Sequence, residues 1–93
     1  MIIHMSIHTP KPDMEQDVIA SMHHYGVAGA GQPGFIEART WRDTRSGRLV
    51  GMAFWEDEAS WRPGVEAMHA AVADDPFDEW EEDATEGFFL EEV

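Results

Sequence analysis

The segment from Leu49 to Trp55 carries apolar side chains on both of its faces. Alternate side chains of a strand point to opposite sides. Leu49, Ala53 and Trp55 therefore share one face, and Met52 and Phe54 lie on the other. A strand with this pattern is covered on both sides. Helices of the same chain can cover one side, but 93 residues leave little material for the second, so we expect a partner there.

The predicted elements follow the order β-α-β-β-α-β, the ferredoxin-like α+β arrangement, in one domain spanning residues 1–93. Apolar alternation indicates strands, and apolar residues at helical spacing indicate helices. The strands are expected at residues 2–8, 35–43, 48–56 and 87–90. The helices are expected at residues 14–27 and 57–72, with a further helical turn from Asp75-Pro76. Turn residues at 43–47 join the middle two strands as a hairpin.

Local signals indicate where the two helices begin. Asp13, with Gln16 three residues later, resembles a capping box, and Asp57 is placed to cap the second helix. Pro63 lacks a backbone amide, so it either kinks the second helix or begins a new one as its first residue.

The charge of the chain excludes several classes of partner. Nineteen acidic residues against six lysine and arginine residues give a net charge of −13, which repels phosphate backbones and anionic lipid. We therefore expect no nucleic acid and no membrane as partner. The N-terminus lacks a signal-peptide pattern, which favours a cytoplasmic location. Ten of the acids lie from Asp74 onward and are interpreted as a solvated acidic rim; adaptation to high salt is a second interpretation of the excess.

Three patterns that would indicate chemistry fail on context or spacing. Residues 29–34 match G-x-G-x-x-G, but they follow a helix and precede a strand, so their amides cannot face a pyrophosphate. His4 and His8 share a strand face but lie about 13 Å apart, too far for one metal ion. No G-x-S-x-G motif supports a serine hydrolase, and there is no cysteine. We expect neither a metal nor a cofactor.

Two residues of the second helix are candidates for function. His69 borders the apolar stripe of that helix, where an imidazole can move a proton near neutral pH. The alternative, which is the more common case for a histidine in this position, is an ordinary residue on the helix flank. Trp61 lies on the stripe itself. With the other tryptophans it forms either a packed core or the lining of a site for a flat aromatic ligand.

Several segments form a series along the whole chain: Gln32–Phe35, Trp41–Asp43, Phe54–Ala59, Asp75–Trp80 and the closing Phe-Leu-Glu-Glu-Val. This series resembles the antibiotic biosynthesis monooxygenase superfamily of small dimeric α/β-barrel proteins. The most specific piece is the strand end Trp55-Glu56-Asp57-Glu58-Ala59.

The resemblance implies that two subunits pack their sheets face to face, which supplies the missing cover as a dimeric α/β barrel. It also implies a ligand cavity between the helices and the sheet of each subunit. Members oxidise quinol-like or anthrone-like aromatics with molecular oxygen and no cofactor, while relatives degrade haem or have no known activity. The side chains expected to line the pocket are apolar and mostly aromatic: Met5, Met22, Trp41, Trp55, Trp61, Met68, Phe77 and Trp80.

The chain departs from the family at the residues that carry chemistry. Quinone-forming and haem-degrading members use an asparagine, and this chain has none. Haem degraders also carry a histidine after the short Phe-containing helix, where this chain continues Trp80-Glu81-Glu82. We expect a homodimer that binds a small aromatic molecule, as a cofactor-independent monooxygenase with His69 as the candidate base. The alternative is a non-catalytic ligand-binding or interaction module.

Overall fold

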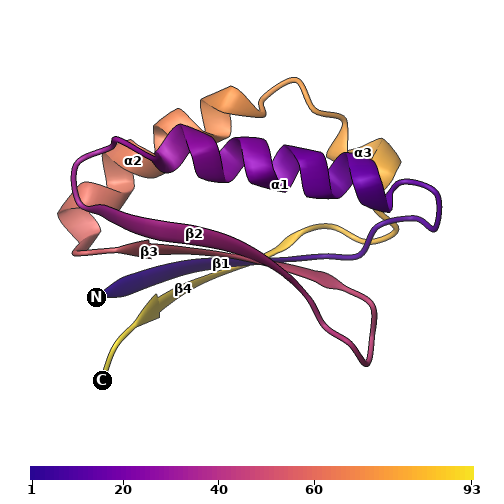
Figure 1. Cartoon of the computed structure of the whole chain (residues 1–93), viewed down its shortest axis with the longest axis horizontal. Coiled ribbons are helices and arrows are strands. Elements are labelled where there is room, and N and C mark those ends of the chain that lie inside the picture. The colour runs from indigo at the N-terminus through magenta and orange to yellow at the C-terminus, as the bar shows by residue number, and fades with distance from the viewer.

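The computed structural model describes residues 1–93 as an antiparallel sheet of four strands with its helices on one face (Figure 1). The strands are β1 (Ile2–His8), β2 (Phe35–Arg42), β3 (Leu49–Trp55) and β4 (Glu86–Glu91), in the spatial order β2-β3-β1-β4. The helices are α1 (Glu15–Gly29), α2 (Glu58–Ala71) and the single turn α3 (Phe77–Trp80). The predicted β-α-β-β-α-β order is confirmed. None of the helices has the length and apolar character needed to cross a bilayer.

The capping prediction is confirmed for α2 and wrong for α1. Oδ1 of Asp57 accepts a hydrogen bond from the amide of Ser60 at 2.8 Å. At α1 the capping residue is Met14, and no side chain caps the helix. Asp13 instead lies in a turn that is closed by the amide of Met14 donating to the carbonyl of Lys11 at 2.9 Å. The helix therefore begins after this turn.

The contact between α2 and the sheet is set by a glycine. The helix continues through Pro63, which therefore does not begin a new helix. The next residue, Gly64, lies directly on Trp55 of β3, because a Cβ at position 64 would be 2.1 Å from Cη2 of the indole. Trp55 is fully buried beneath it. Any larger residue at position 64 would force the helix away from the sheet.

The apolar core is divided into two clusters. They lie toward opposite ends of the central strands, since Ile2 pairs with Trp55 at one end and His8 with Leu49 at the other. The first cluster is Ile2, Ala53, Trp55 and Met68, and the second is Val18, Met22 and Leu49. The division leaves the middle of the helix–sheet interface without large buried side chains.

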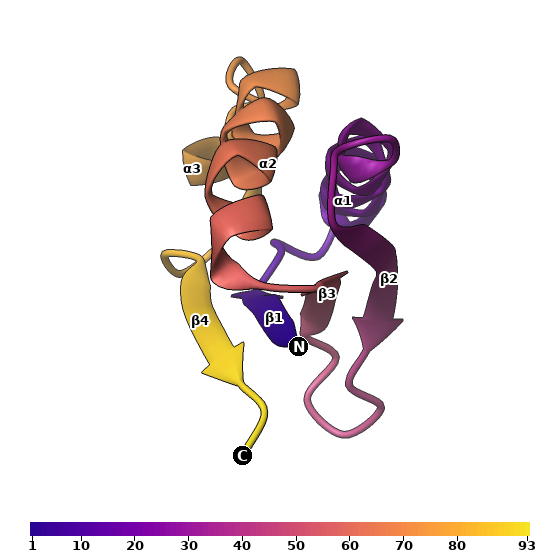
Figure 2. The same ribbon diagram turned by 90° about the vertical axis from the view of Figure 1, so that its left-hand side faces the viewer.

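The other face of the sheet is not covered by any element of this chain (Figure 2). We call it the open face. Its side chains alternate in register with those under the helices, and its apolar members come from all four strands: Ile3, Met5, Ile7, Trp41, Val50, Met52, Phe54, Phe88 and Leu90. Trp41 is 50% exposed and Phe88 is 40% exposed. The apolar pattern on both sides of β3 is thus matched by helices on one side only.

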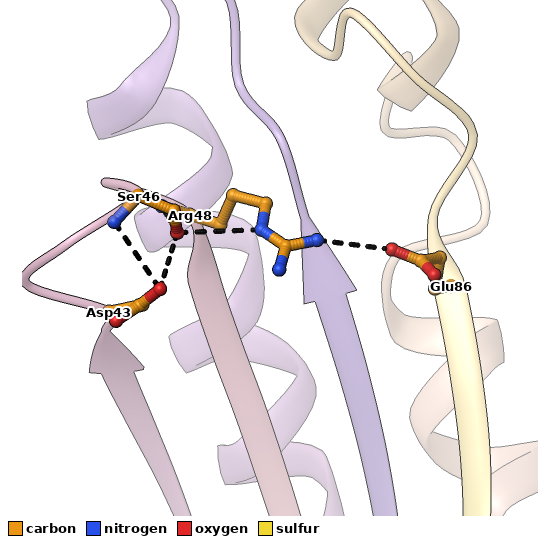
Figure 3. Close-up of polar contacts among 4 residues, drawn as sticks. All are labelled: Asp43, Ser46, Arg48 and Glu86. Atoms are coloured by element: carbon orange, nitrogen blue, oxygen red, sulfur yellow. Dashed lines mark hydrogen bonds and ion pairs between the residues drawn. The ribbon is translucent and has the colours of Figure 1, made fainter.

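A polar network joins the hairpin between β2 and β3 to strand β4 (Figure 3). Oδ2 of Asp43 accepts hydrogen bonds from the hydroxyl of Ser46 at 2.5 Å and from its amide at 3.3 Å. The hydroxyl bond is the main reason why the pKa of Asp43 lies below its ordinary value. Arg48 donates to the Ser46 hydroxyl and, through Nη1, to Glu86 at 3.4 Å. The network therefore crosses β1, which lies between β3 and β4.

Candidate functional site

A cavity of about 720 Å³ lies between the helices and the sheet. It exists because the centre of the sheet carries small residues on its helix-facing side. Ser6 of β1 pairs with Gly51 of β3 and with Gly87 of β4. Two of the three neighbouring positions therefore have no side chain, and α1 and α2 bridge over the space. The volume is in the range of sites for small molecules.

One end of the cavity is organised by four rings, which we call the His4 cluster: His4, Tyr25, Trp61 and His69. The Tyr25 hydroxyl lies 3.4 Å from Nδ1 of His4. The ring centre of His4 lies 5.6 Å from that of Trp61 and 6.3 Å from that of His69. His69 borders the cavity and is exposed, so it stands between the cavity and solvent. This end can exchange protons with water.

The electrostatics of the His4 cluster favour uncharged groups. Burial, with a further contribution from the nearby His69, lowers the pKa of His4. Burial raises the pKa of Tyr25. At neutral pH the imidazole is therefore uncharged and the phenol keeps its proton. The imidazole can accept a hydrogen bond or a proton from a bound hydroxyl, and the phenol can donate one.

The other end of the cavity carries a chain of hydrogen bonds, which we call the His8 network: Ser6, His8, Glu81 and Thr85. Nε2 of His8 lies 3.0 Å from the Ser6 hydroxyl, and Nδ1 lies 3.1 Å from Oε1 of Glu81. Oε2 of Glu81 accepts from the Thr85 hydroxyl at 2.8 Å. His8 and Glu81 are each only 6% exposed. Four polar groups from three separate parts of the chain are thus satisfied by one another.

Backbone pairing beyond the end of β1 explains how Glu81 reaches His8. Pro10 and Glu81 form an isolated antiparallel bridge. The amide of Glu82 donates to the carbonyl of Thr9 at 2.8 Å. The segment after α3 is therefore fastened to the residues that follow β1, and Glu81 is turned inward.

The histidines do not converge on a metal site. No three side chains of His, Asp or Glu lie close enough together to hold an ion. His4 has aromatic neighbours and His69 beside it, whereas His8 is bonded to a single carboxylate. The imidazoles are arranged for hydrogen bonding or proton transfer.

Among the residues predicted for the site, His69, Met22 and Phe77 border the cavity. Trp55 and Met68 lie beside it in the core and are fully buried. They form part of the core next to the cavity. Trp55 packs against Gly64 of α2, and Met68 belongs to the same core cluster.

Trp61 and Trp80 lie at the two ends, while Met5 and Trp41 lie on the wrong side of the sheet. The ring of Trp61 stacks on Phe89 with centres 4.3 Å apart, and Trp80 packs against the second core cluster. Met5 and Trp41 belong to the open face, so neither lines this cavity. Strand alternation groups residues by face, but it does not tell which face the helices will cover.

The polar residues that organise the cavity were not identified as a group from sequence. His4, Ser6 and His8 occupy alternate positions of β1, so alternation alone places them on one face. The spacing Ser-x-His within a strand was the available signal. Glu81 falls in the predicted solvated rim, and that prediction is wrong for this residue because it is buried. Its local sequence does not distinguish it from the acids around it.

Comparison with known families gives a direct match. The family model described as antibiotic biosynthesis monooxygenase matches residues 1–73. Among curated proteins, none matches the chain.

Solved structures share the whole fold at low sequence identity. A mutant of SnoaB, a cofactor-independent oxygenase from Streptomyces nogalater, is 14% identical, with a TM-score of 0.78 over 98% of this chain and 91% of that one. A mutant of MhuD with two manganese protoporphyrin IX molecules bound per active site is 15% identical, with a TM-score of 0.79 over 100% and 95%. A conserved protein from Methanosarcina mazei Go1 is 15% identical, with a TM-score of 0.82 over 99% and 92%. These similarities establish the fold. The family match over residues 1–73 shows that the chain belongs to the antibiotic biosynthesis monooxygenase family.

Proposed function

We propose that this protein binds a small aromatic molecule in its cavity and oxidises it with molecular oxygen, as a cofactor-independent monooxygenase of quinol-like or anthrone-like substrates. The observation that carries the proposal is the His4 cluster, in which an uncharged imidazole and a protonated phenol lie at one end of the cavity. The shared fold with the cofactor-independent oxygenase SnoaB supports this chemistry.

The reaction requires a base and a pocket that excludes water. We assign the base to His69, because it borders the cavity and its exposed ring can exchange the proton with solvent. His4 accepts a hydrogen bond from a substrate hydroxyl through its uncharged ring. Trp61, beside His4, presents an indole nitrogen that is buried without a hydrogen-bond partner, so its N–H is available to a ligand that shifts the ring.

The electron balance needs no further oxidant. An anthrone gives a proton from its methylene carbon to His69, and the carbanion passes one electron to oxygen. The resulting radicals combine to a peroxide anion, which takes up the proton to become a hydroperoxide and then loses water to leave the quinone carbonyl. One oxygen molecule is consumed, with one atom in the product and one in water. The protein contributes the base, the orientation and the exclusion of solvent.

Oxygen uptake with the anthrone dithranol and with a naphthoquinol tests this proposal. We expect consumption above autoxidation, with one oxygen molecule per anthrone and a quinone as product. His69→Ala should lower the rate about 100-fold. Gly87→Leu should abolish binding, because a Cβ at position 87 meets no atom within 4 Å and the side chain can fill the cavity. His24→Ala on the exposed side of α1 is the matched control and should keep the full rate.

The same experiment separates the rival functions. A spectral shift of dithranol without oxygen uptake would identify a binding module and overturn the oxygenase assignment. A Soret shift with haem, together with no binding of dithranol, would instead point to a porphyrin ligand, the class to which the manganese protoporphyrin IX bound by MhuD belongs.

We also propose that two copies pack their open faces together as a homodimer. The open face places apolar residues of all four strands side by side, with Met5 paired to Met52 at its centre. Burying such a face against its own copy removes apolar surface from water, which is the main driving force for association. Sedimentation velocity should give a dimer for the native protein and a monomer for Met52→Glu. Ala70→Lys, on the exposed side of α2, should stay dimeric.

A further inference from the structure

We propose that Ser6 is a second reactive centre in the cavity: a nucleophilic serine that is activated by His8, positioned through Glu81 and directed at uncharged carboxylic esters. The Ser6 hydroxyl lies 3.0 Å from Nε2 of His8, and Nδ1 of His8 lies 3.1 Å from Oε1 of Glu81. Serine, imidazole and carboxylate bonded in this order form the arrangement that serine hydrolases use on several unrelated folds. It is recognised by geometry, so the lack of a G-x-S-x-G motif does not exclude it.

The hydrogen-bond directions in the network suit this role. A carboxylate offers only acceptors, so its bond to His8 requires a hydrogen on Nδ1. In the uncharged imidazole, Nε2 then carries a lone pair, and the Ser6 hydroxyl donates to it. This is the tautomer in which His8 can take the proton from Ser6 as the oxygen attacks.

The carboxylate is fixed and shielded from water. Both oxygens of Glu81 are bonded, one to His8 and one to Thr85, and its side chain is 2% exposed. A buried carboxylate stabilises the positively charged imidazole that forms during attack, because screening by water is weak there. His4, at the other end of the same strand, has no carboxylate partner, so this argument applies to His8 alone.

The space beside Ser6 is kept open by the sheet itself. The neighbouring positions on β3 and β4 are Gly51 and Gly87. A Cβ at Gly51 would lie 2.9 Å from the Ser6 hydroxyl, so any side chain there would crowd it. A Cβ at Gly87 would meet no atom within 4 Å. The carbonyl carbon of an ester can therefore approach the hydroxyl from the Gly87 side.

The reaction is acyl transfer in two balanced steps. The Ser6 oxygen bonds to the ester carbonyl carbon as its proton moves to His8, and the C–O bond then breaks while His8 gives that proton to the leaving alcohol. Water next attacks the acyl group and gives a proton to His8. The bond to Ser6 breaks, Ser6 recovers this proton, and a carboxylic acid is released. No oxidant and no cofactor is consumed.

The surroundings of Ser6 favour an uncharged ester with a small apolar group. Met22 and Phe77 form apolar walls at this end, and the ring of Phe77 lies 5.8 Å from that of His8. The net charge of −13 and the nearby Asp75, which accepts from Ser21 at 2.5 Å, oppose anionic esters.

Labelling with diisopropyl fluorophosphate tests the proposal without any knowledge of the natural substrate. The Ser6 oxygen should displace fluoride, and tandem mass spectrometry should find the adduct on Ser6. Ser21 is the internal comparison, since its hydroxyl is bonded to a carboxylate and not to an imidazole. Ser6→Ala should remove the label, and His8→Gln should slow labelling about 100-fold or more. Ser46→Ala, in the exposed hairpin turn, should label at the native rate.

Hydrolysis of p-nitrophenyl butyrate tests the positioning role of Glu81. We expect Glu81→Gln to lower kcat about 10-fold or more with little change in KM, while circular dichroism shows a folded protein. Folded native protein without label, a label on another serine, or an undiminished rate in His8→Gln would overturn the proposal. A loss in Glu81→Gln that appears in KM or only as a lower Tm would show that Glu81 acts as a structural residue, contrary to the proposal. The outcome is independent of oxygen uptake.

Discussion

The two ends of the cavity are each organised by a histidine of β1, but they are built in different ways. His4 lies among rings and has one long contact, 3.4 Å to the hydroxyl of Tyr25. His8 is bonded at both ring nitrogens, at 3.0 and 3.1 Å. Both side chains come from one face of one strand. The difference therefore arises from what the other elements bring: aromatic side chains from α1 and α2 at one end, and Glu81 from the segment after α3 at the other.

One strand can therefore support two kinds of proton chemistry. Burial without a charged partner favours an uncharged imidazole, whereas a carboxylate at hydrogen-bond distance stabilises the imidazolium that forms when the ring receives a proton. The His4 end is thus suited to receive a proton from a bound ligand. The His8 end is suited to hold a proton that appears during an attack by Ser6.

Removal of Glu81 should have the largest effect on stability. Glu81→Ala leaves Nδ1 of His8 without a partner in a buried site, whereas the hydroxyl of the exposed Thr85 can turn to water. A buried donor left without a partner costs about 2 kcal/mol, so we expect the free energy of unfolding in urea to fall by that amount. Glu82→Ala is the control: its side chain is exposed, and its substitution should cost less than about 0.5 kcal/mol. Equal losses of unfolding free energy in both variants would contradict the idea that the buried His8 network stabilises its end of the cavity.

Replacement of His4 should change the pH dependence more than the stability at neutral pH. His4→Phe exchanges one ring for another and should alter the free energy of unfolding by less than about 1.5 kcal/mol at pH 7. The pKa of His4 is lowered in the folded state from an ordinary value of 6.5. Its contribution to stability is therefore full above that value and is lost as the pH falls through the folded pKa.

Urea titrations between about pH 7 and pH 5 measure this effect. Native protein should lose stability on acidification, and His4→Phe should lose less. His24→Gln keeps His4 and should retain the native slope. If His4→Phe follows the native curve, the imidazole is better hydrated than the structure indicates.

Tyr25 is the only tyrosine, so its ionisation can be followed by the tyrosinate absorbance band. Burial raises its pKa above the ordinary value of 10.0. The band should be missing from folded protein at about pH 10.5 and present in urea-unfolded protein. The stability that this shift contributes is present below pH 10 and is lost as the pH rises further. Tyr25→Phe should cost only about 0.5 kcal/mol, because the contact with His4 is long. If the tyrosinate band of folded protein appears at the ordinary pKa of 10.0, water reaches the Tyr25 hydroxyl.

Much of the arrangement could be predicted from sequence, because it follows from local periodicity. Alternation in residues 2–8 places His4 and His8 on one face, and the apolar stripe around Trp61 identifies a helix that packs on the sheet. The same alternation groups Met5 with the face opposite to His4. Only packing decides which of these two faces receives the helices, so the prediction that Met5 and Trp41 line the cavity is wrong.

Glu81 shows where local patterns stop being informative. It belongs to a run of acids whose composition indicates a solvated surface, and most of its neighbours are exposed. It is buried because the chain after α3 pairs with Thr9 and Pro10. That pairing joins residues about seventy positions apart in sequence. A contact of such range leaves no periodic signal, and the Ser6–His8–Glu81 arrangement depends on it.

The ion pair between Arg48 and Glu86 lies at the same end of the sheet as His8, but in solvent (Figure 3). It should have the smallest effect, because the two side chains are 43% and 56% exposed, and exposed pairs contribute about 0.5 kcal/mol or less. A double-mutant cycle with Arg48→Gln and Glu86→Gln measures their coupling, which should disappear in molar salt. The loss in Glu81→Ala should persist under the same conditions, because salt screens buried groups weakly. A coupling as large as the Glu81 effect would show that cross-strand charge, and not burial, is what fastens this end of the cavity.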